Sequence, residues 1–116
     1  MKKLVVVHYK YNRKTEKTES NLIEIDDTLE SMQALVDGCI EVYPLTSEVV
    51  LVCNDEGKLM GLPITAVAVS EFASAPEMIA GDFFICRRNG EDLVGLIDAD
   101  LFTMEKRVYT IDSLVR

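Results

Sequence analysis

Four groups of closely spaced acidic residues are the first candidates for chemistry in this sequence. They are Asp26 and Asp27, Asp55 and Glu56, Glu91 and Asp92, and Asp98 and Asp100. Each group also has a local structural explanation, because acids are favoured in helix caps and in turns. Asp98 and Asp100 can in addition bind Mg²⁺ together with a phosphate. They are kept as an alternative metal pair, although no resident metal or cofactor is expected.

The three cysteines are the next candidates, as nucleophiles or ligands. Cys39, Cys53 and Cys86 are far apart, odd in number, and each lies in an apolar, strand-like run. This pattern does not predict a zinc site or a disulfide framework, so three buried thiols are expected. A small enzyme with Cys53 as its nucleophile is the alternative. Its base would have to be His8, the only histidine, whose place in an alternating strand favours a structural role.

No established catalytic motif occurs in the chain. There is no glycine-rich phosphate loop, GxSxG elbow, HExxH helix or EF-hand loop. The leading hypothesis is therefore a non-catalytic binding or interaction domain, not an enzyme.

Five residues form the candidate binding site. Glu41 and Tyr43 share one face of a predicted strand, and Asn54 ends the next strand. Glu41 by itself is explained by the solvated side of that strand. Arg87 and Arg88 stand in an otherwise acidic region, where they either block edge-to-edge aggregation or anchor an anionic ligand or an acidic partner.

The charge distribution narrows the class of partner. The net charge is −8, with +5 in residues 1–18, −15 in residues 19–105 and +2 in residues 106–116. An acidic body disfavours direct nucleic-acid binding, which depends on lysine and arginine. It favours a basic host protein, with a small anionic ligand as the second option. Mimicry of DNA is a further alternative, although the acids are scattered among turns and caps and form no stripe. The sequence does not decide whether the chain forms a homo-oligomer.

The N-terminal half predicts four strands, a loop and a helix, and the strand with Glu41 and Tyr43 is one of the four. Residues 4–11 alternate as a half-buried strand, 12–21 read as a mobile polar loop, and 22–25 form the return strand. A helix follows, with Asp27 and Glu30 as its capping box and Gly38 as its left-handed C-cap. Residues 48–54 are near-continuously apolar, which predicts a central strand.

The C-terminal half is less regular. Gly57 is expected to supply a positive φ in the turn 54–57, and residues 58–62 to return as a hairpin strand. Residues 64–78 fit helix and strand equally. "RNG" between 82–87 and 91–97 predicts a hairpin. Asp98 or Asp100 starts a helix to about Lys106, and 107–116 is an extra strand or a tail.

The expected fold is a compact single α+β domain over residues 1–116, mostly antiparallel, with two or three short helices. The longest apolar runs, such as "VVLVC", are strand-sized and fall short of the ~18–20 residues of a membrane span. A cytoplasmic location without membrane contact is therefore expected.

Three segments, in this order, carry a resemblance to a known family. "LIEIDDTLESMQALVDGCIEVYPL", "LVCNDEGKLMGLP" and "IAGDFFICRRNGEDLVGLIDADL" resemble a family of small domains of unknown function from bacteria, phages and mobile elements. That family shows IEVV-like, NEEGKLxGLP-like and IxG-strand segments, and the resemblance covers about residues 4–106. Two features differ: Asp37 replaces the first glycine of a pair, and "ITAV" replaces an asparagine–arginine pair. The resemblance implies an accessory protein that acts on a host protein or sequesters a small ligand.

Overall fold

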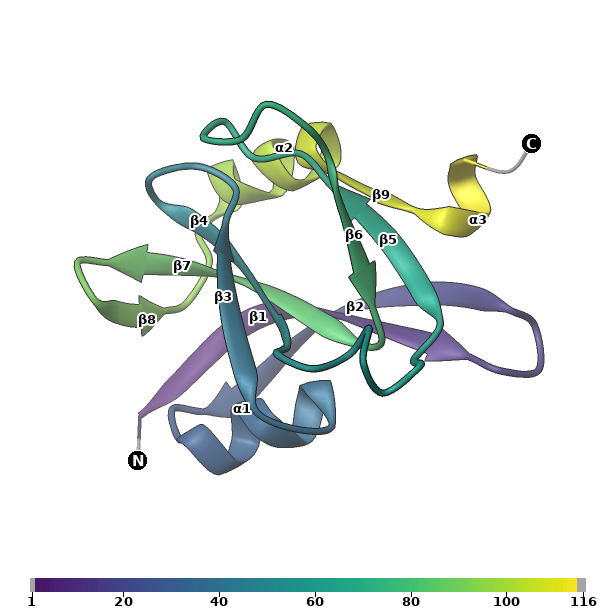
Figure 1. The fold of residues 1–116 in the computed structure, drawn as a ribbon. Coiled ribbons are helices and arrows are strands. Elements are labelled where there is room, and N and C mark those ends of the chain that lie inside the picture. Colours follow the sequence, from purple (N-terminus) through teal and green to yellow (C-terminus); the bar gives the residue numbers. More distant parts are fainter. Residues whose placement is uncertain (1, 115–116) are drawn as a thin grey trace.

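A six-stranded antiparallel sheet forms the centre of the molecule (Figure 1). The computed structural model describes residues 2–114. The strand order is β2-β1-β7-β4-β3, and β8 also pairs with β7. These strands are β1 (Lys3–Asn12), β2 (Lys17–Asp26), β3 (Ile40–Pro44), β4 (Val49–Asn54), β7 (Phe83–Asn89) and β8 (Asp92–Val94).

A second, three-stranded antiparallel sheet and three helices complete the part of the chain that the structure describes. The small sheet has the order β6-β5-β9, and its strands are β5 (Ile64–Ala68), β6 (Glu77–Ala80) and β9 (Val108–Thr110). The helices are α1 (Leu29–Val36), α2 (Asp98–Arg107) and α3 (Ile111–Leu114). The predicted α+β class, with mostly antiparallel sheets in one compact domain, is confirmed. No helix among these residues is long and apolar enough to cross a membrane.

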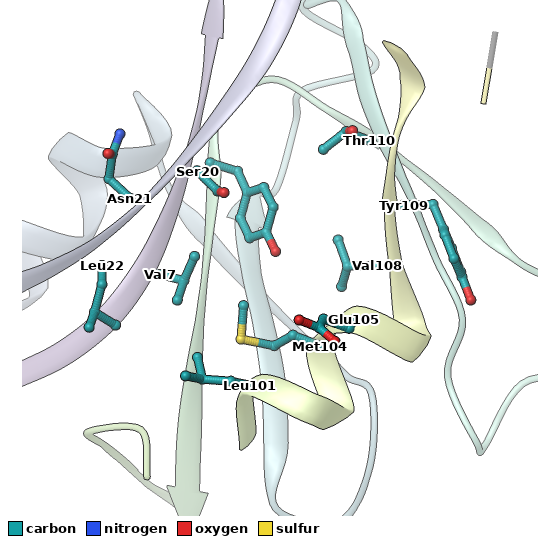
Figure 2. A pocket seen from close by; sticks show the side chains of 11 residues that line it. Val7, Ser20, Asn21, Leu22, Leu101, Met104, Glu105, Val108, Tyr109 and Thr110 are labelled. Carbon is teal, nitrogen blue, oxygen red and sulfur yellow. The ribbon is translucent and has the colours of Figure 1, made fainter. Parts of the chain in front are cut away.

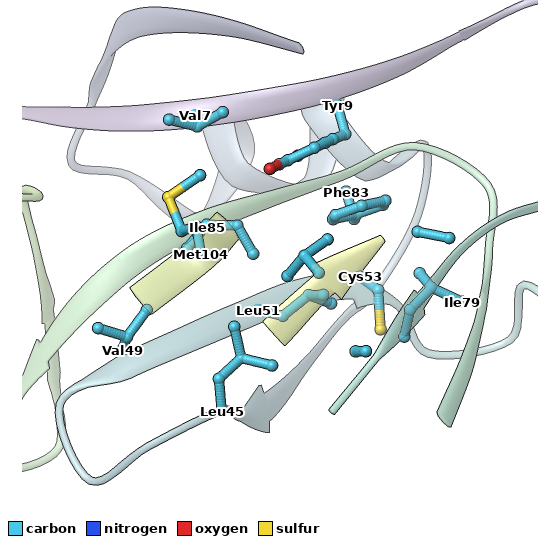
Figure 3. Close-up of a cluster of buried hydrophobic side chains, with 13 residues drawn as sticks. Val7, Tyr9, Leu45, Val49, Leu51, Cys53, Ile79, Phe83, Ile85 and Met104 are labelled. Carbon is cyan, nitrogen blue, oxygen red and sulfur yellow. The ribbon is translucent and has the colours of Figure 1, made fainter. Parts of the chain in front are cut away.

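The large sheet is buried on both faces, which creates two apolar clusters. One face packs on α1 through Met32 and Val36. The other packs on the small sheet and on α2, whose Met104 enters the cluster (Figure 3). In this second cluster the rings of Tyr9 and Phe83 stack with centroids 4.5 Å apart. The large sheet thus lies between α1 on one face and the small sheet with α2 on the other. This sandwich is hollowed at two edges, one lined by β3, β4 and β6 and the other by β1, β2, α2 and β9.

Strand β4 lies inside the large sheet, where its apolar sequence suits burial on both faces. All six of its residues are buried, and it pairs with β3 on one side and β7 on the other. A strand covered on both faces shows a continuous apolar run and no alternation, as the sequence predicted. The β7–β8 hairpin is also confirmed, with Asn89 opposite Asp92 and Gly90 at φ 64° in the turn.

The predicted loop over residues 12–21 is wrong. β1 and β2 form a hairpin of ten consecutive pairs, from Lys3 opposite Asp26 to Asn12 opposite Lys17. Only residues 13–16 turn, and the Asn12 side chain accepts the backbone N–H of Lys14 at 2.9 Å. Residues 17–21 are polar because β2 is an edge strand with little burial. Polar composition therefore described the exposure of this segment and not its backbone conformation.

Helix α1 exists, but its predicted caps are each displaced by one residue. Thr28, not Asp27, is the N-cap, and its hydroxyl accepts the N–H of Ser31 at 3.2 Å. Asp37, not Gly38, takes the left-handed conformation, with φ 59°. Gly38 is needed for a different reason, since a Cβ there would lie 2.6 Å from the side-chain nitrogen of Asn54.

The segment after β4 is a compact turn and not a hairpin strand. Residues 55–61 make successive turns, such as the bond from the Met60 N–H to the Glu56 carbonyl at 2.9 Å. Gly57 does not have the predicted positive φ. It is buried against β6, where a Cβ would meet the Ala80 carbonyl oxygen at 2.7 Å. Glycine is required there by close approach of two backbones.

The remaining uncertain segments are strands joined by loops. Residues 64–78 divide into β5, a loop over 69–76 and the start of β6. Residues 107–116 contain β9 and α3 as far as Leu114, and the last two residues lie outside the described range. Helix α2 is capped at Ile97, and Asp100 accepts the Ile97 N–H at 3.0 Å. The expected role of Asp100 at the start of this helix is therefore confirmed.

Candidate functional site

Strands β3 and β6 border a hollow at one open edge of the sandwich, which we name the β3–β6 pocket. Its volume is about 220 Å³. β3 supplies Glu41 and Tyr43, because alternation along the strand turns both toward the small sheet. The remaining lining residues come from the end of β4, the following turn and β6, and are Cys53, Asn54, Asp55, Glu56, Gly57, Lys58, Leu59, Glu77, Met78, Ile79 and Ala80.

Glu41 is surrounded by other carboxyl groups in this pocket. Partial burial, the negative charge of Asp55, a hydrogen bond with Asp55 and the more distant Glu77 all raise the pKa of Glu41. Lys58 acts in the opposite direction, but its ammonium group is bound to Glu77 at 2.7 Å. The ionised pocket therefore has more negative charge than its single lysine compensates.

Tyr43 forms an apolar wall of the same pocket. It is half-buried and packs against the cluster between the two sheets. Burial and the nearby charge of Glu77 raise its pKa above the ordinary value of 10.0, so the phenol stays neutral at physiological pH. The arrangement places an aromatic ring beside the carboxyl groups of Glu41 and Glu77, a combination suited to a cation.

Asn54, the third predicted site residue in the pocket, is committed to the fold. Its amide nitrogen donates to the carbonyls of Val36 at 3.1 Å and Asp37 at 3.0 Å, which closes the C-terminus of α1. Its side-chain oxygen accepts the N–H of Glu56 at 2.8 Å. Asn54 therefore positions the turn that contains Asp55 and does not present free groups to a ligand.

Cys53 lies at the inner end of the pocket and is a poor nucleophile. Burial, with the charge of Glu41 next, raises the pKa of its thiol to about 12. The sulfur lies 3.9 Å from a Glu41 carboxylate oxygen. A thiolate in this position is disfavoured, because it would add a further negative charge. The geometry supports the buried, structural interpretation of Cys53, and the same holds for Cys86.

Cys39 departs from the expected burial of all three thiols, because it is exposed just before β3. Iodoacetamide is therefore expected to add one label to the native protein, at Cys39, and three labels after denaturation. Intact-mass and peptide mass spectrometry measure both numbers. Rapid labelling of Cys53 in the native protein would contradict the raised thiol pKa and revive the nucleophile hypothesis.

Comparison with known families identifies a match over most of the chain. A family model described as a domain of unknown function, DUF3846, matches residues 11–108. The chain belongs to the DUF3846 family. No curated protein and no solved structure matches it significantly. The predicted resemblance to a family of unknown function is thereby confirmed, and the whole β3–β6 pocket of this DUF3846 domain lies inside the matched segment.

The two predicted arginines lie apart from the pocket in the DUF3846 domain. A guanidinium N–H of Arg87 donates to Glu48 at 2.6 Å, and its Nε lies 3.2 Å from a carboxylate oxygen of buried Asp100. The Nε contact is an ion pair without hydrogen-bond geometry. Two carboxylates thus occupy Arg87, which leaves it unsuited to an anionic ligand. Arg88 follows on the opposite face of β7.

The alternative metal pair is also divided by the structure. Asp98 is exposed on α2, whereas Asp100 is buried and bound to Arg87 and to the Ile97 N–H. Within residues 2–114, no group of three cysteine, histidine or acidic side chains has an arrangement that could hold a metal ion. The pair has separate structural roles in helix capping and charge pairing.

A second hollow, which sequence reasoning missed, lies at the other open edge. We name it the β2–α2 groove; its volume is about 530 Å³ (Figure 2). Its lining comes from β1, β2, α2 and β9, and comprises Val7, Tyr9, Ser20, Asn21, Leu22, Leu101, Met104, Glu105, Val108, Tyr109 and Thr110. The alternation of β1 signalled that Val7 and Tyr9 share a face, but nothing local connected them with α2.

Proposed function

We propose that this DUF3846 domain is a non-catalytic binding domain that takes a cationic side chain of a basic partner protein into the β3–β6 pocket. The observation that carries the proposal is the convergence of Glu41, Asp55 and Glu77 on one small hollow. The raised pKa of Glu41 has a like-charge component, and a bound cation would relieve it. The neutral ring of Tyr43 offers a lysine or arginine a cation–π contact.

The overall charge supports the same class of partner. A body with a net charge of −15 over residues 19–105 steers basic molecules toward it. An anionic ligand has weaker support, because Arg87 is bound to two carboxylates of its own chain. The setting suggested by the family resemblance, an accessory protein of a phage or mobile element that acts on a host protein, is part of this proposal.

Loss of pocket charge is expected to weaken binding of a basic peptide. The probe is a fluorescein-labelled peptide of alternating lysine and serine, measured by fluorescence anisotropy. The double variant Glu41→Gln, Glu77→Gln is expected to bind at least about tenfold more weakly. The matched control Glu91→Gln, Asp92→Asn removes the same charge from the β7–β8 hairpin and should change affinity by less than about twofold.

Equal losses in the two double variants would mean that the whole acidic body attracts the peptide, and the pocket would then be excluded as the site. Absence of peptide binding to the wild-type protein as well as to both variants would contradict the proposal. Affinity should also fall as salt is added, since most of the attraction is between partly exposed charges.

The pH dependence of stability tests the environment of Glu41 directly. The pKa of Glu41 is raised in the folded protein above its ordinary 4.5, so the folded state holds this proton more tightly than the unfolded state. Ionisation of Glu41 therefore costs stability as pH rises above about 4.5. The difference in unfolding free energy between the Glu41→Gln variant and wild type, measured by urea unfolding, should shift in favour of the variant as pH rises from about 4 to about 7. A difference that does not change with pH would contradict the carboxyl cluster.

A further inference from the structure

The hydrogen-bonding direction of β2 can be derived from its neighbours. The backbone N–H of Tyr11 donates to the Asp82 side chain, and the backbone carbonyl of Val5 accepts the Leu96 N–H. The backbone N–H and C=O groups of odd-numbered residues in β1 are therefore directed away from β2. Even-numbered residues of β1 therefore bond to β2, and the register places His8 opposite Asn21. It follows that odd-numbered residues of β2 bond to β1, whereas even-numbered residues direct their N–H and C=O groups outward.

The ends of this outer edge are closed and its middle is open. The outward N–H of Thr18 donates to Asp112 at 3.4 Å, and the carbonyl of Asp26 accepts the Thr28 N–H at 2.9 Å. Between them lie Ser20, Leu22 and Glu24. Within residues 2–114, no hydrogen-bond partner is found for their outward backbone groups. Three successive outward-facing residues form the template on which another strand can pair.

The open edge runs beside the β2–α2 groove. Ser20 and Leu22 belong both to the edge and to the groove lining, and Figure 2 shows Val7, Met104 and Val108 along the interior of the groove. The Leu22 side chain is 62% exposed. An added strand would place alternate side chains over this apolar surface, which is how strand addition combines backbone pairing with side-chain selection.

Charge indicates the kind of segment that fits. Among the residues lining the β2–α2 groove, Glu105 is the only charged one, and Figure 2 shows it above Met104. Glu24 adds a second carboxylate on the open edge. A second copy of this chain is disfavoured as the occupant, because each copy has a net charge of −8. An extended segment is complementary to this surface if its apolar residues and a lysine or arginine share one register, so that all of them face the groove and Glu105.

We propose that the outer edge of β2 is a docking site for an extended, apolar and basic segment of a partner protein, which adds to the large sheet as a further strand. Its backbone pairs with Ser20, Leu22 and Glu24, its apolar side chains enter the β2–α2 groove, and a lysine or arginine meets Glu105. This surface lies apart from the β3–β6 pocket, and its test does not depend on that pocket.

The test uses the 116-residue chain and the labelled peptide TVTKTVT, whose two valines and lysine point to the same face of an extended strand. The peptide should bind, and hydrogen exchange followed by NMR should show new protection at the amides of Ser20, Leu22 and Glu24. N-methylation of the peptide on alternate residues, in each of the two registers, should reduce affinity at least about tenfold in one register. The analogue TVTETVT should bind at least about tenfold more weakly, because its glutamate faces the groove and repels Glu105.

Two variants of Leu22 distinguish the contribution of backbone pairing to peptide binding from the contribution of the Leu22 side chain. Leu22→Pro removes an outward N–H without removing a bond to β1, a position that proline tolerates on an edge strand. It should abolish binding, whereas Leu22→Ala should weaken it less. If Leu22→Pro does not fold, the two methylated peptides decide the question alone.

Three results would overturn the proposal. The first is no saturable binding of TVTKTVT. The second is binding without protection of the three amides, or equal binding of both methylated forms. The third is protection that rises with protein concentration in the absence of peptide, which would identify a second copy of the chain as the occupant.

Discussion

Replacement of Phe84 by alanine is expected to lower the free energy of unfolding by about 3–5 kcal/mol. Phe84 lies on β7 opposite His8 of β1 and Val52 of β4, and its side chain is fully buried in the cluster beneath α1. The substitution removes the apolar contacts of the ring and leaves a cavity between the large sheet and α1. Relaxation is restricted, because β7 is held by strands on both sides.

Urea unfolding followed by circular dichroism measures the effect, and the chain has a matched control. Phe102 is 69% exposed on α2, so Phe102→Ala should change stability by no more than about 0.5 kcal/mol. Equal effects of the two substitutions would contradict the described packing of α1 on the sheet. A loss at Phe84 below about 1.5 kcal/mol would do the same.

Replacement of Arg87 by methionine is expected to lower the free energy of unfolding by about 2–3 kcal/mol, somewhat below the usual cost of breaking a fully buried pair. The Asp100 side chain is only 4% exposed, and Arg87 is its only ion-pair partner among the described residues. Methionine leaves that carboxylate buried without a compensating charge. Since the Arg87 side chain is 21% exposed, water limits the penalty.

A double-mutant cycle isolates this pair. Asp100→Asn retains an oxygen that can accept the Ile97 N–H, so the helix cap survives while the charge is removed. The double variant should be more stable than Arg87→Met alone, and Arg88→Met serves as the control with the same change of residue type. If Arg87→Met and Arg88→Met cost the same, the pair with Asp100 does not stabilise the fold as described.

Local sequence patterns predict part of the fold that Figure 1 shows. The apolar run of β4 and the asparagine–glycine turn of the β7–β8 hairpin were predicted correctly. In each of these segments the cause lies within a few residues: burial on both faces, and a turn that needs positive φ. The loop predicted over residues 12–21 failed because the polarity of an edge strand is indistinguishable from that of a loop.

The candidate site shows the same division. Glu41 and Tyr43 were placed on one strand face by the alternation of β3, which is a local property. Their proximity to Glu77 depends on the packing of β6 against β3 and β4, and no periodicity in the sequence encodes it. Likewise, the ion pair between Arg87 and Asp100 occupies one residue that was predicted to bind a ligand and one that was predicted to bind a metal.

The sequence by itself determined the α+β class, the central strand β4, the family resemblance and the acidic body, because composition and short-range periodicity carry this information. Only the tertiary structure decided which charges are compensated and where the sandwich is open. Those properties depend on contacts between residues far apart in the chain. Three carboxyl groups from β3, the turn after β4 and β6 converge on the β3–β6 pocket, and the edge of β2 meets the groove beside α2.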